Sequence, residues 1–137
     1  MVAKIKAILS HIPKWLMSGI VLALVLWLTL APHPTGNTNI HLFPGADKVV
    51  HGIMFGGLAF VVCIDMMHAR HWHKLGLATI GCIAFCTCIL GIIIEIAQEK
   101  MGLGRSLEIL DMLADSAGAL IGCGIWAALN DNFADSE

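Results

Sequence analysis

The chain has 137 residues, enough for one domain. It is 58% hydrophobic and only 13% charged, whereas soluble domains carry about 25% charged residues, so the composition excludes a soluble core and indicates an integral membrane protein. The formal net charge of -2, without a basic patch that contains aromatic residues, excludes a nucleic-acid partner. The five cysteines lie in apolar runs, which argues against a disulfide framework.

Four apolar runs are each close to the roughly 20 residues that a membrane-spanning helix needs. The first covers about residues 15–31 and ends at Pro32. It is longer than the about 7–15 residues of a signal-peptide core, so we expect an uncleaved span. The other runs cover about residues 48–67, 75–98 and 110–129. The sequence therefore predicts an all-α polytopic membrane protein, a bundle of four transmembrane helices that forms one domain over residues 1–137.

Basic residues predict the orientation of the spans, because they are enriched in cytoplasmic loops. Five fall on one side of the predicted membrane: Lys4, Lys6, Lys14, Arg70 and Lys74. Three fall on the other side: Lys48, Lys100 and Arg105. We therefore expect a bacterial inner-membrane protein with both termini in the cytoplasm and with the loops after the first and third spans on the extracytoplasmic side.

Polar and ionisable residues gather at span ends that share one membrane surface, because an even number of crossings separates them. They are Asp47, Lys48 and His51; Glu95 and Gln98; Arg105, Ser106 and Glu108; Asp111 and Asp115. Ionisable groups within a membrane are costly and are usually functional. Acidic residues at a helix N-terminus can instead be caps, and an ion pair can simply join two helices. We expect a polar pocket, with structural caps or ion pairs as the alternative.

Small residues occur at helical spacing beside these polar groups. The stripes contain Gly52 and Gly56; Gly81, Ala84, Cys88 and Gly91; Gly118 and Gly122. Small residues four apart let membrane helices approach closely. We expect the carboxylates to point at neighbouring helices rather than at lipid, and the same faces also permit an oligomer.

Two stretches, ADKVVHGIMFGGLA and IEIAQEKMGLGRSLEILDMLADSAGALIG, resemble the VanZ-like family. The matching positions are Asp47, Lys48, His51, Glu95, Gln98, Gly104, Arg105, Ser106, Glu108, Asp111, Gly118 and Gly122. Glu108 stands where family members often have Asp, and Asp115 where we would expect Asn. The resemblance implies a small multispan protein of the cell envelope, and the founding member is linked to resistance to the antibiotic teicoplanin.

The first functional hypothesis is a non-enzymatic protein that binds an amphiphile. Lys48 and Arg105 would hold a phosphate or carboxylate, while the carboxylates orient them or contact an amine. The ligand would be a membrane lipid, a lipid-linked envelope molecule or a lipoglycopeptide. The ligand-binding candidates are Lys48, His51, Glu95, Gln98, Arg105, Ser106, Glu108, Asp111 and Asp115.

The second hypothesis is an intramembrane enzyme that acts on a lipid-linked substrate. His51 paired with Asp47 would be the general base, and Glu95 or Asp115 the general acid. Arg105 would stabilise the developing anionic charge. A structural membrane subunit is the third hypothesis.

A divalent metal is an alternative occupant of the polar pocket. His51, Glu95, Asp111 and Asp115 form a set that suits Mn or Zn. However, Arg105 and Lys48 would compete for the same carboxylates. The sequence also has no phosphate loop or zinc-protease motif. We therefore expect neither a metal nor another cofactor.

Overall fold

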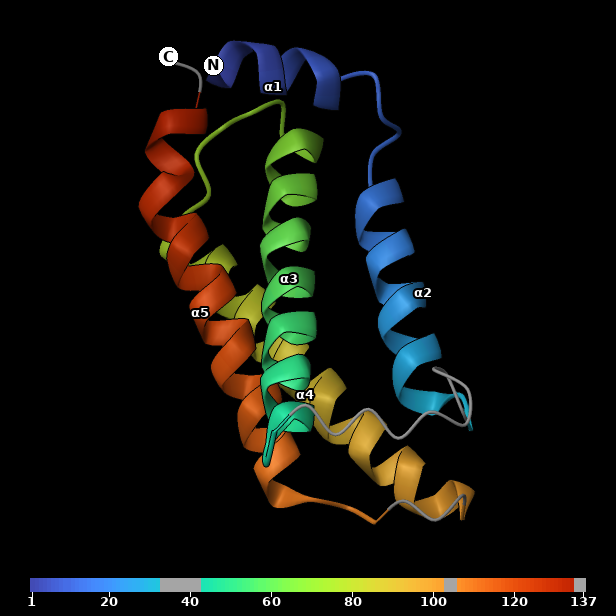
Figure 1. Ribbon diagram of the computed structural model, residues 1–137. Coiled ribbons are helices and arrows are strands. Elements are labelled where there is room, and N and C mark those ends of the chain that lie inside the picture. Colours follow the sequence, from blue (N-terminus) through green and yellow to red (C-terminus); the bar gives the residue numbers. More distant parts are fainter. Residues whose placement is uncertain (33–42, 103–105, 135–137) are drawn as a thin grey trace.

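Four helices run along the long axis of the molecule, and a short fifth helix lies across one end (Figure 1). The computed structural model describes residues 1–32, 43–102 and 106–134. The described residues form five α-helices: α1 (Val2–Leu9), α2 (Leu16–Leu30), α3 (Ala46–Ala69), α4 (Leu77–Met101) and α5 (Ile109–Phe133). The N-terminus and the end of α5 lie at the end that α1 covers. The predicted fold, a helical membrane bundle, is confirmed.

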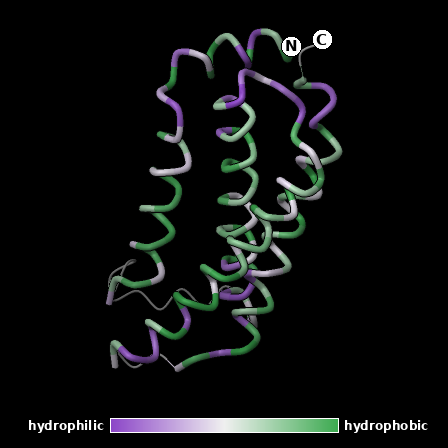
Figure 2. The backbone as a smooth tube through the Cα atoms, turned by 180° about the vertical axis from the view of Figure 1, so that it is seen from behind, coloured by the Kyte–Doolittle hydropathy of each residue, from purple (hydrophilic) through white to green (hydrophobic). Residues whose placement is uncertain are grey.

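Three of the helices are long and apolar enough to cross a membrane. α3, α4 and α5 have 24, 25 and 25 residues, which corresponds to about 36–38 Å at about 1.5 Å per residue. α2 is a shorter apolar helix of 15 residues, or about 22 Å, less than the about 30 Å hydrocarbon core of a bilayer. It packs beside α3 and α4. Hydrophilic residues lie mostly toward the two ends of the bundle (Figure 2).

The short helix α1 was not predicted from the sequence. Its basic residues mark the N-terminal segment, but eight residues are too few for a clear helical pattern. The helix buries none of its residues fully. Lys6 Nζ lies 5.2 Å from the ring centre of Trp72, in the connection between α3 and α4. This cation–π contact helps to hold α1 across the end of the bundle.

The backbones of α3 and α5 touch at four glycines. A Cβ atom on Gly118 would lie 2.1 Å from the carbonyl oxygen of Gly52, and one on Gly122 would lie 2.2 Å from that of Gly56. The expected close packing at these positions is therefore confirmed, and the glycines face each other within one chain. The oligomer stays a prediction.

The expected small-residue stripe of α4 is wrong in part. Gly81 is exposed, and an added Cβ there would meet nothing within 4 Å. Ile80 and Ile83 are the buried residues next to it, together with the predicted Ala84. The other three predicted residues do face the bundle: Ala84 is in the core, Cys88 Sγ lies 4.0 Å from the Ser116 carbonyl oxygen of α5, and Gly91 lies against Asp115.

A buried carboxylate fixes the start of α2, and the sequence gave no sign of this role. Asp65 of α3 is fully buried, and its Oδ2 accepts hydrogen bonds from Ser18 N at 2.8 Å and from Ser18 Oγ at 2.7 Å. Ser18 lies in the first turn of α2, where backbone N–H groups have no partner within the helix. Asp65 therefore joins α2 to α3 near the end that α1 covers.

Asp65→Ala should destabilise the protein by about 1–3 kcal/mol, because the Ser18 N–H and hydroxyl would lose a charged acceptor in a buried place. The measurement is thermal unfolding of the purified protein in detergent. Asp131→Ala is the matched control: this exposed aspartate of α5 pairs with Lys74, and surface ion pairs contribute little. Equal losses in the two variants would contradict the capping role.

Candidate functional site

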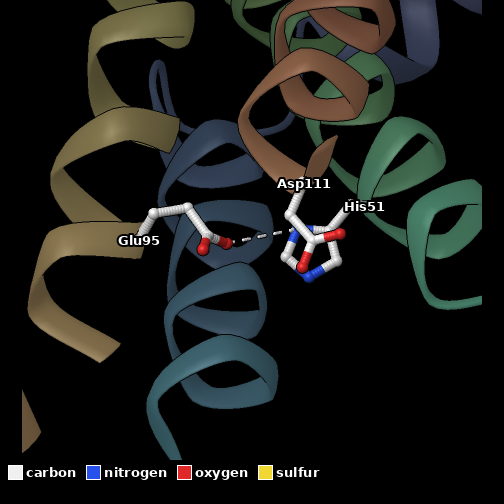
Figure 3. Close-up of side chains that lie close together, drawn as sticks. All are labelled: His51, Glu95 and Asp111. Carbon is white, nitrogen blue, oxygen red and sulfur yellow. Dashed lines mark ion pairs between the residues drawn. The ribbon is translucent and has the colours of Figure 1, made fainter. Parts of the chain in front are cut away.

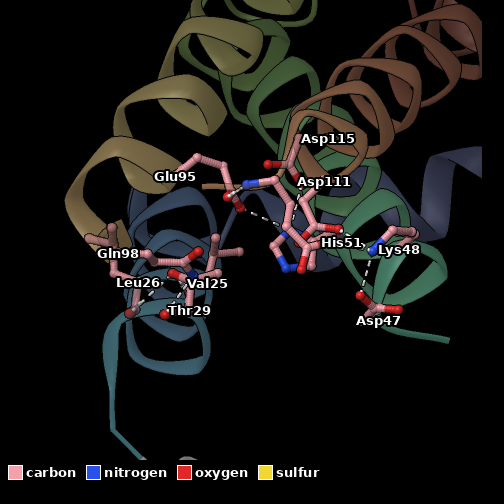
Figure 4. A network of polar contacts seen from close by, with 11 residues as sticks. Val25, Leu26, Thr29, Asp47, Lys48, His51, Glu95, Gln98, Asp111 and Asp115 are labelled. Atoms are coloured by element: carbon pink, nitrogen blue, oxygen red, sulfur yellow. Dashed lines mark hydrogen bonds and ion pairs between the residues drawn. The ribbon is translucent and has the colours of Figure 1, made fainter. Parts of the chain in front are cut away.

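Glycines place charged residues directly at the ends of the long helices. α3 begins after Gly45 and α4 ends just before Gly102, and these glycines have φ angles of 82° and 63°. Glycine adopts this left-handed conformation without the steric penalty that other residues incur. The start of α3, the end of α4 and the start of α5 all lie at the end of the bundle opposite α1 (Figure 1). Ionisable side chains from the three helices meet there (Figure 4).

These side chains form two groups that share Asp111. We call Asp47, Lys48, Glu108 and Asp111 the outer cluster, and His51, Glu95, Asp111 and Asp115 the inner cluster. The two clusters differ in exposure. In the outer cluster the side chains of Asp47 and Glu108 are 56% and 48% exposed, whereas in the inner cluster those of Glu95 and Asp115 are 1% and 0% exposed.

Lys48 holds the outer cluster together. Its Nζ lies 2.7 Å from Asp47 Oδ2, 2.9 Å from Glu108 Oε2 and 3.1 Å from Asp111 Oδ1. Three carboxylates thus surround one ammonium group, and the cluster keeps an excess of negative charge. The predicted role of Lys48 in holding a phosphate or carboxylate of a ligand stays a prediction.

His51 lies between two buried carboxylates in the inner cluster. Its Nδ1 is 2.9 Å from Asp115 Oδ1 and 4.0 Å from Glu95 Oε1. The Glu108 backbone N–H donates a 3.4 Å hydrogen bond to Glu95 Oε2. Glu95 Oε1 and Asp115 Oδ2 are buried without a hydrogen-bond partner among the residues that the structure describes. Figure 3 shows the Glu95 carboxylate pointing toward His51 and Asp111.

The predicted pair of His51 and Asp47 is wrong. The two residues are one turn apart on α3, but Asp47 binds Lys48, and His51 binds Asp115 of α5. The close approach of α3 and α5 brings Asp115 within reach of the imidazole. Gly91 of α4 leaves space for the Asp115 side chain, because a Cβ at position 91 would lie 2.9 Å from Asp115 Oδ2.

The helix-capping alternative does not describe these acids. The N-cap residues of α3 and α5 are Gly45 and Glu108, and neither makes a side-chain cap hydrogen bond. Asp47 and Asp111 lie in the first helical turns and bind Lys48 instead. Ion pairs with Lys48 thus compensate part of the charge of the outer cluster, whereas the inner cluster keeps buried oxygens without a hydrogen-bond partner among the described residues.

Among the described residues, two predicted site residues, Gln98 and Ser106, lie outside both clusters. Gln98 is buried, and its Nε2 donates a 2.7 Å hydrogen bond to the Thr29 carbonyl, so it joins α4 to the end of α2 (Figure 4). Ser106 is exposed at the start of the segment that leads into α5. Arg105 lies outside the described residues. Thr29 carried no sequence signal, because its backbone carbonyl rather than its side chain receives this bond.

An apolar groove between α3 and α5 begins at the outer cluster. It has a volume of about 620 Å³. Its lining residues are Lys48, Val49, Gly52, Ile53, Gly56, Gly57, Phe60, Ala114, Ala117, Gly118, Ile121, Gly122 and Ile125. The many small residues leave room between larger side chains such as Ile53 and Ile121. The sequence marked the glycines as packing positions, but not the groove.

Long apolar helices that surround buried ionisable groups define a multi-pass membrane protein with a polar site at one end of a helical bundle. A family model, VanZ/LLP1, matches residues 15–130. The chain therefore belongs to the VanZ/LLP1 family, and the VanZ-like resemblance of the sequence is confirmed. The matched range contains all residues of both clusters. Comparisons with curated proteins and with solved structures give no match.

Proposed function

We propose that this protein binds an amphiphile in the bacterial envelope. A protonated amine of the head group contacts the outer cluster, and an acyl chain lies in the groove between α3 and α5. The observation that carries the proposal is that the groove is apolar along its length and has Lys48, with its three carboxylate partners, at one end. A groove that is charged at one end and apolar along the rest matches the charged head group and the apolar chain of an amphiphile.

The charge of the outer cluster favours an amine over an anion. Asp47 and Glu108 are about half exposed, so they are accessible to a ligand. Lys48 compensates only one of the three negative charges around it. The ammonium group of a ligand would compensate a second of these charges, and a phosphate approaching the same carboxylates would be repelled. The groove volume lies within the about 300–1,000 Å³ of typical small-molecule sites.

The ligand classes that share this chemistry are a membrane lipid, a lipid-linked envelope molecule and a lipoglycopeptide of the teicoplanin type. We place both termini in the cytoplasm and the clusters at the extracytoplasmic side of the bacterial inner membrane, following the distribution of basic residues. Binding there would contribute to teicoplanin resistance by holding either the antibiotic or the envelope molecule that it recognises.

Gly57→Leu tests the proposal, because Gly57 lines the groove and has open space around the position of a Cβ. The added side chain should fill the groove without disturbing the backbone. We expect cross-linking by phosphatidylethanolamine with a photoactivatable acyl chain to fall about tenfold or more, equivalent to about 1.4 kcal/mol. Teicoplanin resistance of cells that express the variant should fall as well.

Gly81→Leu is the matched control, since Gly81 is an exposed glycine of α4 with equally open surroundings and does not line the groove. It should cross-link as the wild type does. Phosphatidylglycerol with the same acyl group separates the contribution of the amine from that of the chain. Equal labelling of wild type and Gly57→Leu would contradict the proposed groove.

A second candidate function is an intramembrane enzyme, and the pair of His51 and Asp115 favours it. A buried carboxylate 2.9 Å from the imidazole Nδ1 orients the ring, as in paired acid–base groups of enzymes. Glu95, close to the same nitrogen, supplies a second acid–base group. The test is incubation of the purified protein with envelope lipids, followed by mass spectrometry. A product that His51→Ala fails to form would favour the enzyme; no product from the wild type would favour the binding protein.

A further inference from the structure

The geometry points to a divalent-cation site in the inner cluster, with His51, Glu95 and Asp111 as ligands for an ion of the Mn²⁺ or Zn²⁺ type. One ring nitrogen of His51, one oxygen of Glu95 and one oxygen of Asp111 all lie within 4.8 Å of one another. Each comes from a different helix, α3, α4 or α5. The ion would therefore connect the three long helices of the bundle.

The distances between the three donor atoms suit a bound metal ion. Donor atoms lie about 2.0–2.2 Å from bound zinc, so two donors of a tetrahedral site are about 3.3–3.6 Å apart. Small side-chain rotations would bring the three donors from within 4.8 Å to these distances. A set of carboxylates with one imidazole suits Mn²⁺ and Zn²⁺, because carboxylates favour the first and imidazole the second.

The independent observation is the unpartnered Glu95 carboxylate. Glu95 is fully buried, and its Oε1 has no hydrogen-bond partner among the described residues. This oxygen points toward His51 and Asp111 (Figure 3). Buried charged groups in proteins are paired or bind metals, because removing them from water is costly. Asp115 Oδ2 is buried and unpartnered in the same place.

Charge also favours a cation here. The inner cluster contains three carboxylates and one imidazole, and a divalent ion would compensate most of that negative charge. Lys48 is the described competitor, with Nζ 3.1 Å from Asp111 Oδ1. A carboxylate has lone pairs on both oxygens, so Asp111 can serve Lys48 and an ion together. In the outer cluster Lys48 already occupies the space between the carboxylates.

Asp115 has a positioning role in this site. Its Oδ1 lies 2.9 Å from His51 Nδ1 and holds the imidazole ring between α3 and α5. In metal-binding histidines a carboxylate of this kind commonly pairs with the ring nitrogen that does not bind the ion, which makes Nε2 of His51 the ligand here, and loss of the carboxylate weakens metal binding by about 10–100-fold. Gly91 is part of the same arrangement, since a larger residue there would collide with Asp115.

The test uses the purified full chain in detergent, freed of ions by a chelator and titrated with MnCl₂ or ZnCl₂. Loss of the free Mn²⁺ electron paramagnetic resonance signal, and calorimetry for Zn²⁺, should show one saturable site per chain. Glu95→Gln, which keeps the side-chain shape, should weaken binding by at least about tenfold. Asp47→Asn, which removes an acid of the outer cluster only, should bind as the wild type does.

A second measurement needs no variant and covers the case in which Glu95→Gln fails to fold. Electron spin-echo modulation of bound Mn²⁺ in protein labelled with ¹⁵N-histidine should show coupling to one imidazole nitrogen. Absence of saturable binding, or binding without imidazole coupling, would overturn the assignment. So would a loss of binding in Asp47→Asn that Glu95→Gln does not show. The ion is tested without added lipid or antibiotic, so a failure to bind it leaves the groove experiment unaffected, and the converse also holds.

Discussion

Gly118→Ala should destabilise the bundle by at least about 3 kcal/mol, the upper end of the usual cost of overpacking. The new Cβ would lie 2.1 Å from the carbonyl oxygen of Gly52. The obstacle is backbone rather than the end of a flexible side chain, so it cannot move aside without displacing α3. We expect α3 and α5 to separate at this point, and the contact of His51 with Asp115 to be lost with them. Thermal unfolding in detergent measures the effect.

Gly124→Ala is the matched control for this prediction. It makes the same substitution in the same helix, but a Cβ on Gly124 would meet nothing within 4 Å. It should be neutral or slightly stabilising, because the helix propensity of alanine is more favourable than that of glycine by up to about 1 kcal/mol. Gly122→Ala should behave like Gly118→Ala, since its Cβ would lie 2.2 Å from the Gly56 oxygen. If Gly118→Ala and Gly124→Ala unfold alike, the contact between the two backbones is looser than the structure shows.

His51→Ala is the second substitution with a large expected effect, a loss of about 3–5 kcal/mol in the free energy of unfolding. The imidazole is the partner of Asp115 Oδ1 and the nearest described basic group to Glu95 Oε1. Its removal would leave two fully buried carboxylates without a basic partner among the described residues. The measurement is unfolding by heat or denaturant in detergent, with chelator present so that bound ions do not contribute.

Two further variants show whether buried charge causes that loss. His73→Ala removes an exposed histidine from the connection between α3 and α4 and should have little effect. Adding Asp115→Asn to His51→Ala removes one of the stranded charges and should restore about 0.5–3 kcal/mol, the usual coupling between residues in contact. If the loss of unfolding free energy in the double variant equals the sum of the losses in the two single variants, His51 acts by packing alone.

The helical bundle and the common end of its polar residues could be predicted from the sequence. Apolar runs of about 20 residues define helices, and the number of crossings between Asp47, Glu95 and Asp111 determines that they share a surface. The close packing of Gly52 with Gly118 could also be expected, because glycines four apart form a contact face. These features depend only on local patterns along the chain.

The pairing within the clusters could not be predicted, because it depends on how each helix is rotated about its axis. Spacing along α3 suggested that His51 binds Asp47, but the rotation of α5 brings Asp115 closer. The role of Asp65 was equally hidden, since its partner Ser18 lies 47 residues earlier in a different helix. The groove is lined by residues of both α3 and α5, so it forms only when the two helices pack together and the pattern of neither helix alone predicts it.

The short length of α2 has a consequence for the lipid around the protein. A bilayer next to an apolar helix of about 22 Å thins locally to avoid exposing hydrocarbon, at a cost of fractions of a kcal/mol per Å. Gln98 ties the end of α2 to α4 only three residues beyond Glu95. The membrane surface is therefore expected to dip beside the inner cluster, so that lipid head groups and dissolved ions come close to side chains that would otherwise lie within the hydrocarbon.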